Sequence, residues 1–578
     1  MKLLTRFLIT VVLAITLAGC NQTNETTNST DDKDEATSTV YSYQQGIIQE
    51  TNHGDVEGYE NEEENTLVWK GIPYAKPPVD ELRWKAPEDP EEFEGTFNAT
   101  EPSDIAIQAS AEGVTGSEDS LNLDIYRPNT DKTDLPVLLF IHGGNNQTGT
   151  SEEITGDAFV NDLDAIFISI NYRLGPLGFN PLPALRTGNE LEDSGNYALL
   201  DIAQSLDWVK ENIESFGGDP DNITISGFSA GGRDVMAALT SPVFDGKFQK
   251  AIAFSGGMTM ADQEDSVKVF AKAIAPLVVE DGVKATEEEA YEWLQKEEEE
   301  VKDYLYSLSA ERLSGLMNNA GIRMSVFPHL YNDGTVLPEE QFDTTNYHSV
   351  PLMMLTGTSE FSFFALGDPY FSASFEDGSL FSNETKRNEF EFAKKYGSEL
   401  YRLFNTQESA LTMYDNYDAP IYTIEIPFGD ELTETTDMDT FGSFHGVFVP
   451  LLDSNNTSYL SMILDSFQLE GAKDLSSQFK AYLSNFLHEG DPNGEGLTQW
   501  EPWTKEQPAN LVLTANEEKS VAQMSGVTTT KEDVIAEIEA DTSISDESKE
   551  KIINEVLNGR WFSEELDQYY GNSSLWIE

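Results

Sequence analysis

Cysteine, histidine and basic residues are all scarce in this chain of 578 residues. It contains one cysteine, Cys20, so no disulfide can form within the chain. It has 35 lysines and arginines against 103 aspartates and glutamates, which gives a formal net charge of −68. Binding to nucleic acid requires positive charge to neutralise phosphates, so this balance argues against a nucleic acid partner. The acidity favours solubility and fits adaptation to high salt, where ions screen repulsion between like charges.

The start of the chain has the pattern of a bacterial export signal. Lys2 and Arg6 precede an apolar stretch over residues 7–17, which is too short to span a bilayer comfortably. Leu17-Ala18-Gly19-Cys20 follows and resembles a lipobox, in which the cysteine is lipidated and becomes the mature N-terminus. We therefore predict a lipoprotein signal peptide over residues 1–20, lipidation of Cys20, and a location outside the cytoplasm, anchored to the bacterial cell membrane.

Residues 21–40 are rich in Asn, Thr, Ser and Asp and contain almost no apolar side chains. Such a composition cannot bury enough apolar surface to fold, so we expect a disordered tether. About 20 flexible residues have a root-mean-square reach of about 25 Å. The folded part of the protein would then lie just outside the membrane.

A candidate nucleophile occurs in Gly227-Phe228-Ser229-Ala230-Gly231. The apolar residues 222–226 before it predict a buried strand, and residues 234–239 after it predict the start of a helix. A G-x-S-x-G sequence between a strand and a helix is typical of a nucleophile elbow, which projects the serine from a tight, strained turn. The glycines are needed because larger side chains would collide with the turn or with neighbouring strands. Ser229 is therefore the predicted nucleophile.

A second motif supplies candidate hydrogen-bond donors for the reaction. Residues 135–141 form a continuous apolar run, as expected of a central parallel strand, and His142-Gly143-Gly144-Asn145 follows it. Attack on an ester creates negative charge on the carbonyl oxygen, which backbone N–H groups of such a loop can stabilise. The predicted oxyanion-hole donors are the N–H groups of Gly144, Asn145 and Ala230.

The chain has six histidines, and two of them follow every candidate acid in the order nucleophile, acid, base. His488 ends an amphipathic stretch over residues 479–487, where a histidine is favourable at a helix C-terminus, so we interpret it as structural. His445 lies in the glycine-flanked loop 441–446, which could present an imidazole to a cleft. His445 is the predicted base.

The catalytic acid is predicted from its position after a strand. Residues 351–358 read as another buried strand, and Glu360 follows its C-terminal end, where functional groups gather in open α/β sheets. Glu360 would orient His445 and stabilise its imidazolium form. Asp333 and Asp368 are alternative acids, and both occur in turn-like sequences.

These motifs resemble the type-B carboxylesterase family, the cholinesterase-like branch of the α/β-hydrolases, over about residues 68–514. Further matches are Gly71-Ile72-Pro73-Tyr74-Ala75, Leu82-Arg83-Trp84, Ser117-Glu118-Asp119-Ser120-Leu121-Asn122-Leu123, Asn171-Tyr172-Arg173-Leu174-Gly175 and Phe216-Gly217-Gly218-Asp219-Pro220. The resemblance implies an α/β-hydrolase fold, with a central, mostly parallel sheet flanked by helices. It also implies a serine carboxylesterase that uses Ser229, Glu360 and His445 and needs no metal or organic cofactor.

Several positions depart from the family pattern. Asn145 replaces the third glycine of the oxyanion loop, Phe228 replaces a common glutamate, and Ser120 replaces a cysteine. The acid segment is about two residues shorter than usual, and the segment after His445 lacks a common acidic residue. An alternative function is therefore a non-catalytic, cholinesterase-like binding or adhesion protein at the cell surface.

The predicted catalytic domain covers residues 41–520, and a helical extension covers residues 521–578. In the extension, a capping box at Thr530 predicts one helix and residues 546–557 predict a second, with Gly559 as its C-cap. We expect these helices to dock on the catalytic domain through the aromatic pairs Trp561-Phe562 and Tyr569-Tyr570. A separate helical stretch is expected over residues 287–308.

Overall fold

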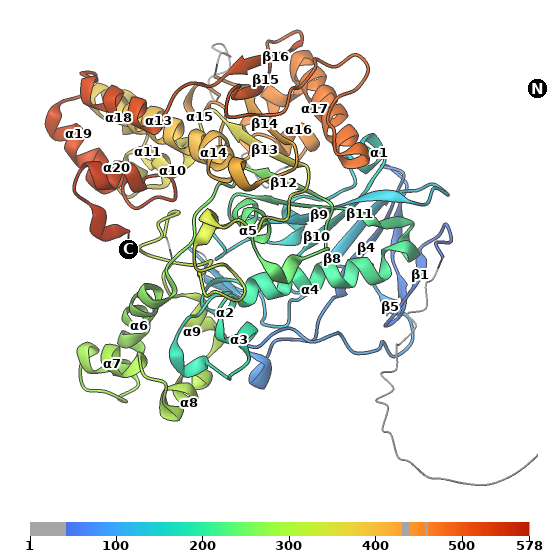
Figure 1. Cartoon of the computed structure of the whole chain (residues 1–578), viewed down its shortest axis with the longest axis horizontal. Helices are drawn as coiled ribbons and strands as arrows, with labels where there is room; N and C mark the ends of the chain where they lie inside the picture. The colour runs from blue at the N-terminus through green and yellow to red at the C-terminus, as the bar shows by residue number, and fades with distance from the viewer. Residues whose placement is uncertain (1–41, 112, 319, 431–437, 457–460, 577–578) are drawn as a thin grey trace, which may run out of the picture. The chain divides into compact units, whose positions relative to one another are not determined.

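An eleven-stranded β-sheet forms the centre of the molecule (Figure 1). The computed structural model describes residues 42–111, 113–318, 320–430, 438–456 and 461–576. They belong to one compact unit, residues 40–578. The predicted signal peptide, Cys20 and the predicted tether lie outside the described residues.

The central sheet is parallel in its middle and antiparallel at its two edges. Its strand order is β16-β15-β14-β13-β12-β11-β9-β10-β8-β4-β3. The strands between β10 and β15 in this order are parallel to one another, whereas β8, β4, β3 and β16 pair with their neighbours antiparallel. The strands are β3 (Tyr59–Asn61), β4 (Thr66–Pro73), β8 (Asn122–Pro128), β9 (Leu135–Ile141), β10 (Ile166–Ile170), β11 (Gly218–Phe228), β12 (Lys250–Phe254), β13 (Leu352–Gly357), β14 (Ile421–Ile426), β15 (Ala509–Ala515) and β16 (Ser520–Gly526). Two small sheets contain β1 (Ile48–Thr51), β2 (Gly54–Glu57) and β5 (Phe97–Asn98), and β6 (Gln108–Ser110) and β7 (Gly113–Thr115).

Helices flank this sheet, as expected for the predicted α/β fold (Figure 1). The helices α4, α5 and α17 contact its central strands. The helices are α1 (Val160–Leu163), α2 (Gly175–Gly178), α3 (Glu190–Asp193), α4 (Tyr197–Asn212), α5 (Ala230–Ala238), α6 (Gln263–Glu280), α7 (Glu287–Leu294), α8 (Glu299–Ser307), α9 (Ala310–Ser314), α10 (Ser362–Gly367), α11 (Ser372–Glu376), α12 (Ser379–Ser382), α13 (Glu384–Leu403), α14 (Ser409–Met413), α15 (Met438–Phe441), α16 (Val449–Leu452), α17 (Glu470–Glu489), α18 (Lys531–Ala540), α19 (Asp546–Ile552) and α20 (Glu564–Tyr569).

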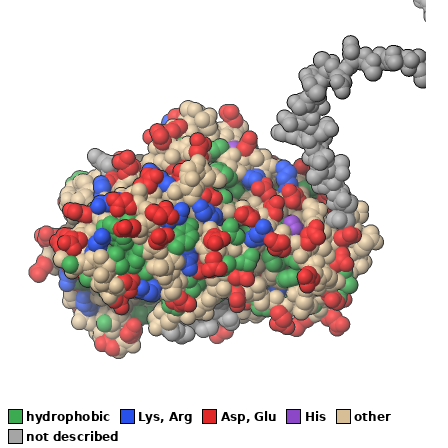
Figure 2. Space-filling view, turned by 90° about the horizontal axis from the view of Figure 1, so that it is seen from below, with side chains coloured by type: hydrophobic (Ala, Val, Ile, Leu, Met, Phe, Trp, Pro, Cys, Tyr) green, Lys and Arg blue, Asp and Glu red, His purple; other side chains and the backbone are tan. Residues whose placement is uncertain are grey.

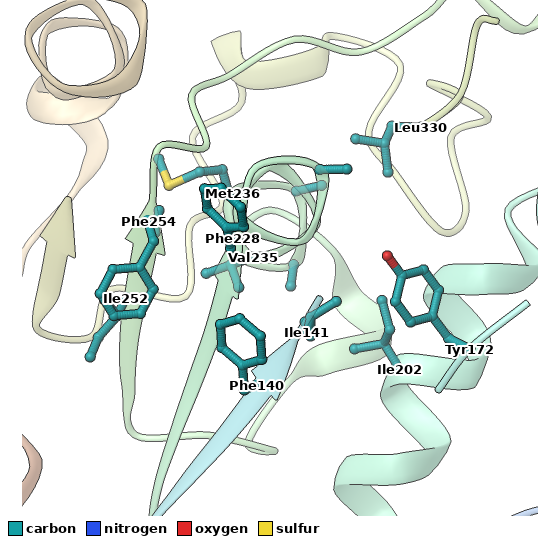
Figure 3. Packing of buried hydrophobic residues seen from close by; sticks show 14 of the residues in the cluster. Phe140, Ile141, Tyr172, Ile202, Phe228, Val235, Met236, Ile252, Phe254 and Leu330 are labelled. Atoms are coloured by element: carbon teal, nitrogen blue, oxygen red, sulfur yellow. The ribbon is translucent and has the colours of Figure 1, made fainter. Parts of the chain in front are cut away.

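The strands that carry the predicted site are all present. The apolar runs predicted as strands correspond to β9, β11 and β13, and every residue of β9 and β13 is buried, because helices cover both faces of a parallel sheet. Figure 3 shows Phe228, Val235 and Met236, around the β11–α5 turn, packed beside side chains of β9 and β12. The helix α5 begins at Ala230, four residues earlier than predicted, because the turn at Ser229 leads directly into it.

The helical stretch predicted over residues 287–308 is two helices, α7 and α8. The break falls between Leu294 and Glu299, within the glutamate-rich segment. Leu294 at the end of α7 and Val301 on α8 are both buried.

The C-terminal extension docks on the rest of the molecule as predicted. The capping box at Thr530 is formed, and both α18 and α19 pack against α13. The second helix, α19, continues as a π-helical turn over Ile553–Leu557. Trp561 and Phe562 are buried, but the prediction of Tyr569 as an anchor is wrong, since 60% of its surface is exposed. The sheet continues to Gly526, six residues past the predicted end of the catalytic domain.

Carboxylate side chains are spread across the molecular surface. Figure 2 shows aspartate and glutamate scattered over the face viewed, with no gathering of lysine and arginine into one patch. Within the part of the chain that the structure describes, the search for a helix long and apolar enough to cross a membrane finds none.

Candidate active site

Ser229 occupies the sharp turn between β11 and α5. Its backbone has φ 57° and ψ −116°, a conformation that is strained for a residue with a side chain. A Cβ atom added to Gly227 would lie 2.2 Å from the carbonyl oxygen of Gly231, and one added to Gly231 would lie 2.2 Å from that of Ile141. Gly227 is therefore required for the turn to close, and Gly231 for the turn to pack against β9, as the motif predicts.

His445 and Glu360 form a buried pair. The Nδ1 atom of His445 makes a short hydrogen bond with Oε2 of Glu360, a carboxylate with no exposed surface. The other carboxylate oxygen, Oε1, accepts hydrogen bonds from Ser255 Oγ (2.6 Å), Gly357 N (2.6 Å) and Thr356 Oγ1 (3.0 Å). These bonds offset the cost of burying the carboxylate and fix its orientation. They also leave Oε2 available to His445.

The alternative acids and the alternative base lie elsewhere. His488 is near the C-terminus of α17, as expected of a structural residue, and its Nε2 lies 3.2 Å from the carbonyl oxygen of Leu163. Asp368 pairs with two arginines, Arg323 and Arg560. Asp333 accepts hydrogen bonds from Asn196 and from the backbone N–H groups of Thr335, Val336 and Leu337. Of the three candidate acids, the structure brings Glu360 to His445.

Ser229 and His445 line one open pocket of about 620 Å³. The Nε2 atom of His445 has no hydrogen-bond partner among the described residues. In enzymes without substrate the nucleophile–base contact is often long, and it tightens when substrate binds. The unused nitrogen is the one that a base needs, because Nδ1 is held by Glu360.

The predicted oxyanion loop lies against the nucleophile. Gly144 and Asn145 line the same pocket and adopt positive φ angles of 90° and 59°. A Cβ atom on Gly143 would lie 3.1 Å from Cβ of Ser229, which shows how closely the two segments approach. Ala230 is the first residue of α5, so its N–H has no acceptor within the helix. Gly144 and Asn145 thus share a pocket with Ser229, and Ala230 directly follows it.

Sequence reasoning missed the residues that hold this loop in place. Nδ2 of Asn146 donates to Oδ1 of Asp234 on α5 at 2.9 Å, and the Tyr172 hydroxyl lies 2.9 Å from both the Asn146 Oδ1 and the His142 carbonyl oxygen. Burial raises the pKa of Asp234 to about 7 and lowers the pKa of the His142 imidazole to about 4. The signals in the sequence were the asparagine pair after Gly144 and the family motif that contains Tyr172.

Three aromatic rings enclose the His445 imidazole. Ring centroids lie 4.6 Å away for Phe228, 5.1 Å for Phe364 and 5.4 Å for Tyr401. Tyr401 comes from α13 and belongs to no sequence motif, so it too was missed. Among the described residues, no group of three or more histidine, cysteine, aspartate or glutamate side chains is arranged to hold a metal ion.

The site residues lie in segments that follow β9, β11, β13 and β14, at one edge of a mostly parallel sheet. This fold and the nucleophile turn define the protein as an α/β-hydrolase. Residues 45–417, more than half of the chain, match the model of the carboxylesterase family. The chain belongs to this family.

Individual relatives agree with this assignment. Para-nitrobenzyl esterase of Bacillus subtilis (strain 168) is 41% identical over 241 residues, which cover 40% of this chain and about half, 48%, of that relative. Carboxylesterase 1E of Mus musculus is 28% identical over 495 residues, covering 76% of this chain and 84% of the mouse protein. A solved PNB esterase structure matches 85% of this chain and 100% of its own, with a TM-score of 0.65 and 26% identity.

Proposed function

We propose that the protein is a serine carboxylesterase that hydrolyses carboxylic esters to acid and alcohol. The observation that carries the proposal is the His445–Glu360 pair, whose free imidazole nitrogen belongs to the same pocket as the serine of a nucleophile elbow. Membership of the carboxylesterase family supports the same chemistry.

The arrangement supports a two-step reaction. Ser229 Oγ attacks the ester carbonyl carbon while His445 Nε2 takes its proton, and the N–H groups of Gly144, Asn145 and Ala230 stabilise the oxyanion. His445 then gives the proton to the departing alkoxide, which leaves an acyl group on Ser229. Water, activated by His445, hydrolyses this acyl-enzyme and releases the acid. Glu360 holds the imidazole in the required tautomer and stabilises its charged form.

The test is hydrolysis of p-nitrophenyl esters from acetate to long chains by the protein lacking residues 1–20. Ser229→Ala should abolish turnover without lowering the thermal midpoint. Ser241→Ala is a matched control, because its hydroxyl is also buried and has no partner in the described part of the chain. Activity that survives in Ser229→Ala would refute the assignment. If the wild-type protein hydrolyses no ester, the alternative of a non-catalytic binding or adhesion protein gains support instead.

We further propose that the enzyme is a lipoprotein, anchored outside the cytoplasm through a lipid on Cys20. The lipobox-like sequence Leu17-Ala18-Gly19-Cys20 supports this location. Cells that express the full chain should incorporate labelled palmitate into the protein and retain it in the membrane fraction, whereas Cys20→Ala should do neither. Equal labelling of both proteins would contradict the proposal.

A further inference from the structure

Tyr401 is a buried phenol beside the catalytic pair that the mechanism above does not use. Its ring stacks on the His445 imidazole, with centroids 5.4 Å apart and planes inclined by 23°. The side chain is fully buried, and its hydroxyl makes no hydrogen bond of good geometry with any described residue. Leaving such a group unpaired in a native structure is costly, so its retention calls for an explanation.

The Tyr401 hydroxyl is a donor close to the nucleophile. Burial, and then the charge of Glu360, raise the pKa of the Tyr401 phenol well above its ordinary value, so the hydroxyl keeps its proton at neutral pH. Interaction with the Ser229 hydroxyl lowers the pKa of the same phenol, against these two effects.

The C-terminal extension holds the Tyr401 ring. Phe562 stacks on Tyr401 with centroids 4.9 Å apart and planes inclined by 30°, and Trp561 meets it edge-on at 6.5 Å. Trp561 also covers the guanidinium of Arg233, which lies 4.1 Å from the Trp561 ring centroid. Arg233 belongs to the first turn of α5, the helix that begins directly after Ser229. The extension therefore reaches both the helix of the nucleophile and the ring beside the base.

The same part of the extension is bonded to the pocket wall. The N–H of Trp561 donates to the carbonyl oxygen of Ile322 at 3.1 Å, and the N–H of Met324 donates to that of Gly559 at 3.2 Å. Gly321 and Ile322 line the pocket that contains Ser229. Arg560, which pairs with Asp368 at 2.7 Å, adds an ionic attachment. The position of Phe562 is therefore fixed relative to the pocket.

We propose that Tyr401, held in place by Phe562 of the C-terminal extension, is a positioning residue of the active site. Its ring fixes the plane of the His445 imidazole, and its hydroxyl donates a hydrogen bond to Ser229 Oγ. With one lone pair of Oγ occupied in this way, the serine O–H is directed to His445 Nε2. This inference rests on the proposed function, because it assigns a role in activating the same nucleophile.

The decisive variant is Tyr401→Phe, which keeps the ring and removes the hydroxyl. We expect kcat to fall about tenfold with little change in KM, the scale of one lost hydrogen bond. The thermal midpoint should change little, because the Tyr401 hydroxyl has no partner other than the proposed one to Ser229 among the described residues. Tyr126→Phe is the matched control, since Tyr126 on β8 also has a buried hydroxyl with no partner among the described residues. Its kcat should equal that of the wild type.

A second readout does not depend on ester turnover. A fluorophosphonate reacts with an activated serine: the bond from Ser229 Oγ to phosphorus forms, the phosphorus–fluorine bond breaks, fluoride leaves and the proton passes to His445. Tyr401→Phe should slow this labelling about tenfold, in parallel with kcat. If Tyr401→Phe is labelled as fast as the wild type, the proposal is overturned. If the wild type is labelled but hydrolyses no ester, the proposed function fails while these rates still decide the role of Tyr401. An unreactive Ser229 in the wild type would overturn both.

The role of the extension is tested by combining two substitutions. Phe562→Leu keeps an apolar side chain but removes the stacked ring, and should slow labelling severalfold on its own. If Phe562 acts by placing the Tyr401 hydroxyl, Phe562→Leu should lower the rate less than twofold in the Tyr401→Phe background. Fully additive effects would overturn the proposal that Phe562 places the Tyr401 hydroxyl.

Discussion

Replacing Glu360 by glutamine should inactivate the site while leaving its shape intact. Glutamine has the size of glutamate but offers one oxygen and one NH₂ group. The Gly357 N–H is a fixed backbone donor to Oε1, so the glutamine oxygen must occupy that position. The NH₂ group is then forced toward His445 Nδ1, which can accept its hydrogen only if that nitrogen carries no proton. The proton of the neutral imidazole moves to Nε2.

This change of tautomer sets the size of the effect. An imidazole protonated at Nε2 cannot take the proton of Ser229, and its charged form has lost the carboxylate that stabilised it. The same exchange in other catalytic triads lowers kcat about 10⁴-fold, which corresponds to about 5 kcal/mol of transition-state stabilisation. We expect a loss of this order in kcat for p-nitrophenyl acetate at pH 7, with KM changed far less.

Two controls separate this mechanism from a general loss of structure. The thermal midpoint of Glu360→Gln should stay near that of the wild type, because the hydrogen bonds to Oε1 are retained. Glu399→Gln removes a glutamate that pairs with Arg402 on α13, and Arg402 keeps its other partner, Glu425. This variant should have wild-type activity. A folded Glu360→Gln protein that keeps more than a tenth of the wild-type kcat would show that the tautomer argument is wrong.

Two further predictions concern the framework around the site. Gly231→Ala should destabilise the fold by about 3 kcal/mol or more in urea unfolding, because its Cβ would meet the Ile141 backbone, which cannot move aside; a loss below about 1 kcal/mol would contradict the packing of the elbow. For Asp234, burial raises the folded-state pKa to about 7 from 3.8, so the folded protein holds a proton that the unfolded chain releases. Its contribution to stability is therefore present below about pH 4 and is lost as the pH rises to about 7. The stability of Asp234→Asn relative to the wild type should therefore increase from pH 5 to pH 8. Thermal unfolding of both proteins at the two pH values measures this, and an equal difference in midpoint at both would contradict the argument.

The strands and the three triad candidates could be predicted because their signals are local. The strands β9 and β13 are continuous apolar runs, and the glycine spacing in the Gly227–Gly231 motif indicates a tight turn. Chain order left both His445 and His488, and the glycine-flanked loop around His445 made it the better candidate. The choice of Glu360 over Asp368 rested on its position after a strand, and the structure agrees because the carboxyl ends of neighbouring strands meet at one edge.

The remaining features depend on contacts between segments that are distant in sequence. Nothing local to residue 401 indicates that its ring meets His445 and Phe562, since α13 reads as an ordinary amphipathic helix. The break between α7 and α8 was missed because residues 295–298, which are Gln, Lys, Glu and Glu, are all good helix formers. The prediction that Tyr569 docks on the catalytic domain was wrong because the sequence does not show which aromatic side chains have neighbours to pack against.

The departures from the family pattern make physical sense when each is considered with its new neighbours. The short acid segment still reaches His445, because the Ser359 N–H donates to the Ser443 carbonyl oxygen at 2.9 Å and draws the two loops together. Phe228, where glutamate is common, packs its ring 4.6 Å from the His445 ring. Asn145 keeps the positive φ that a glycine would adopt, and the next residue, Asn146, bonds the loop to α5 through Asp234. Substituting Asn145 by glycine alone would therefore restore the family sequence without improving the loop, because Asn146 and Asp234 already hold its shape.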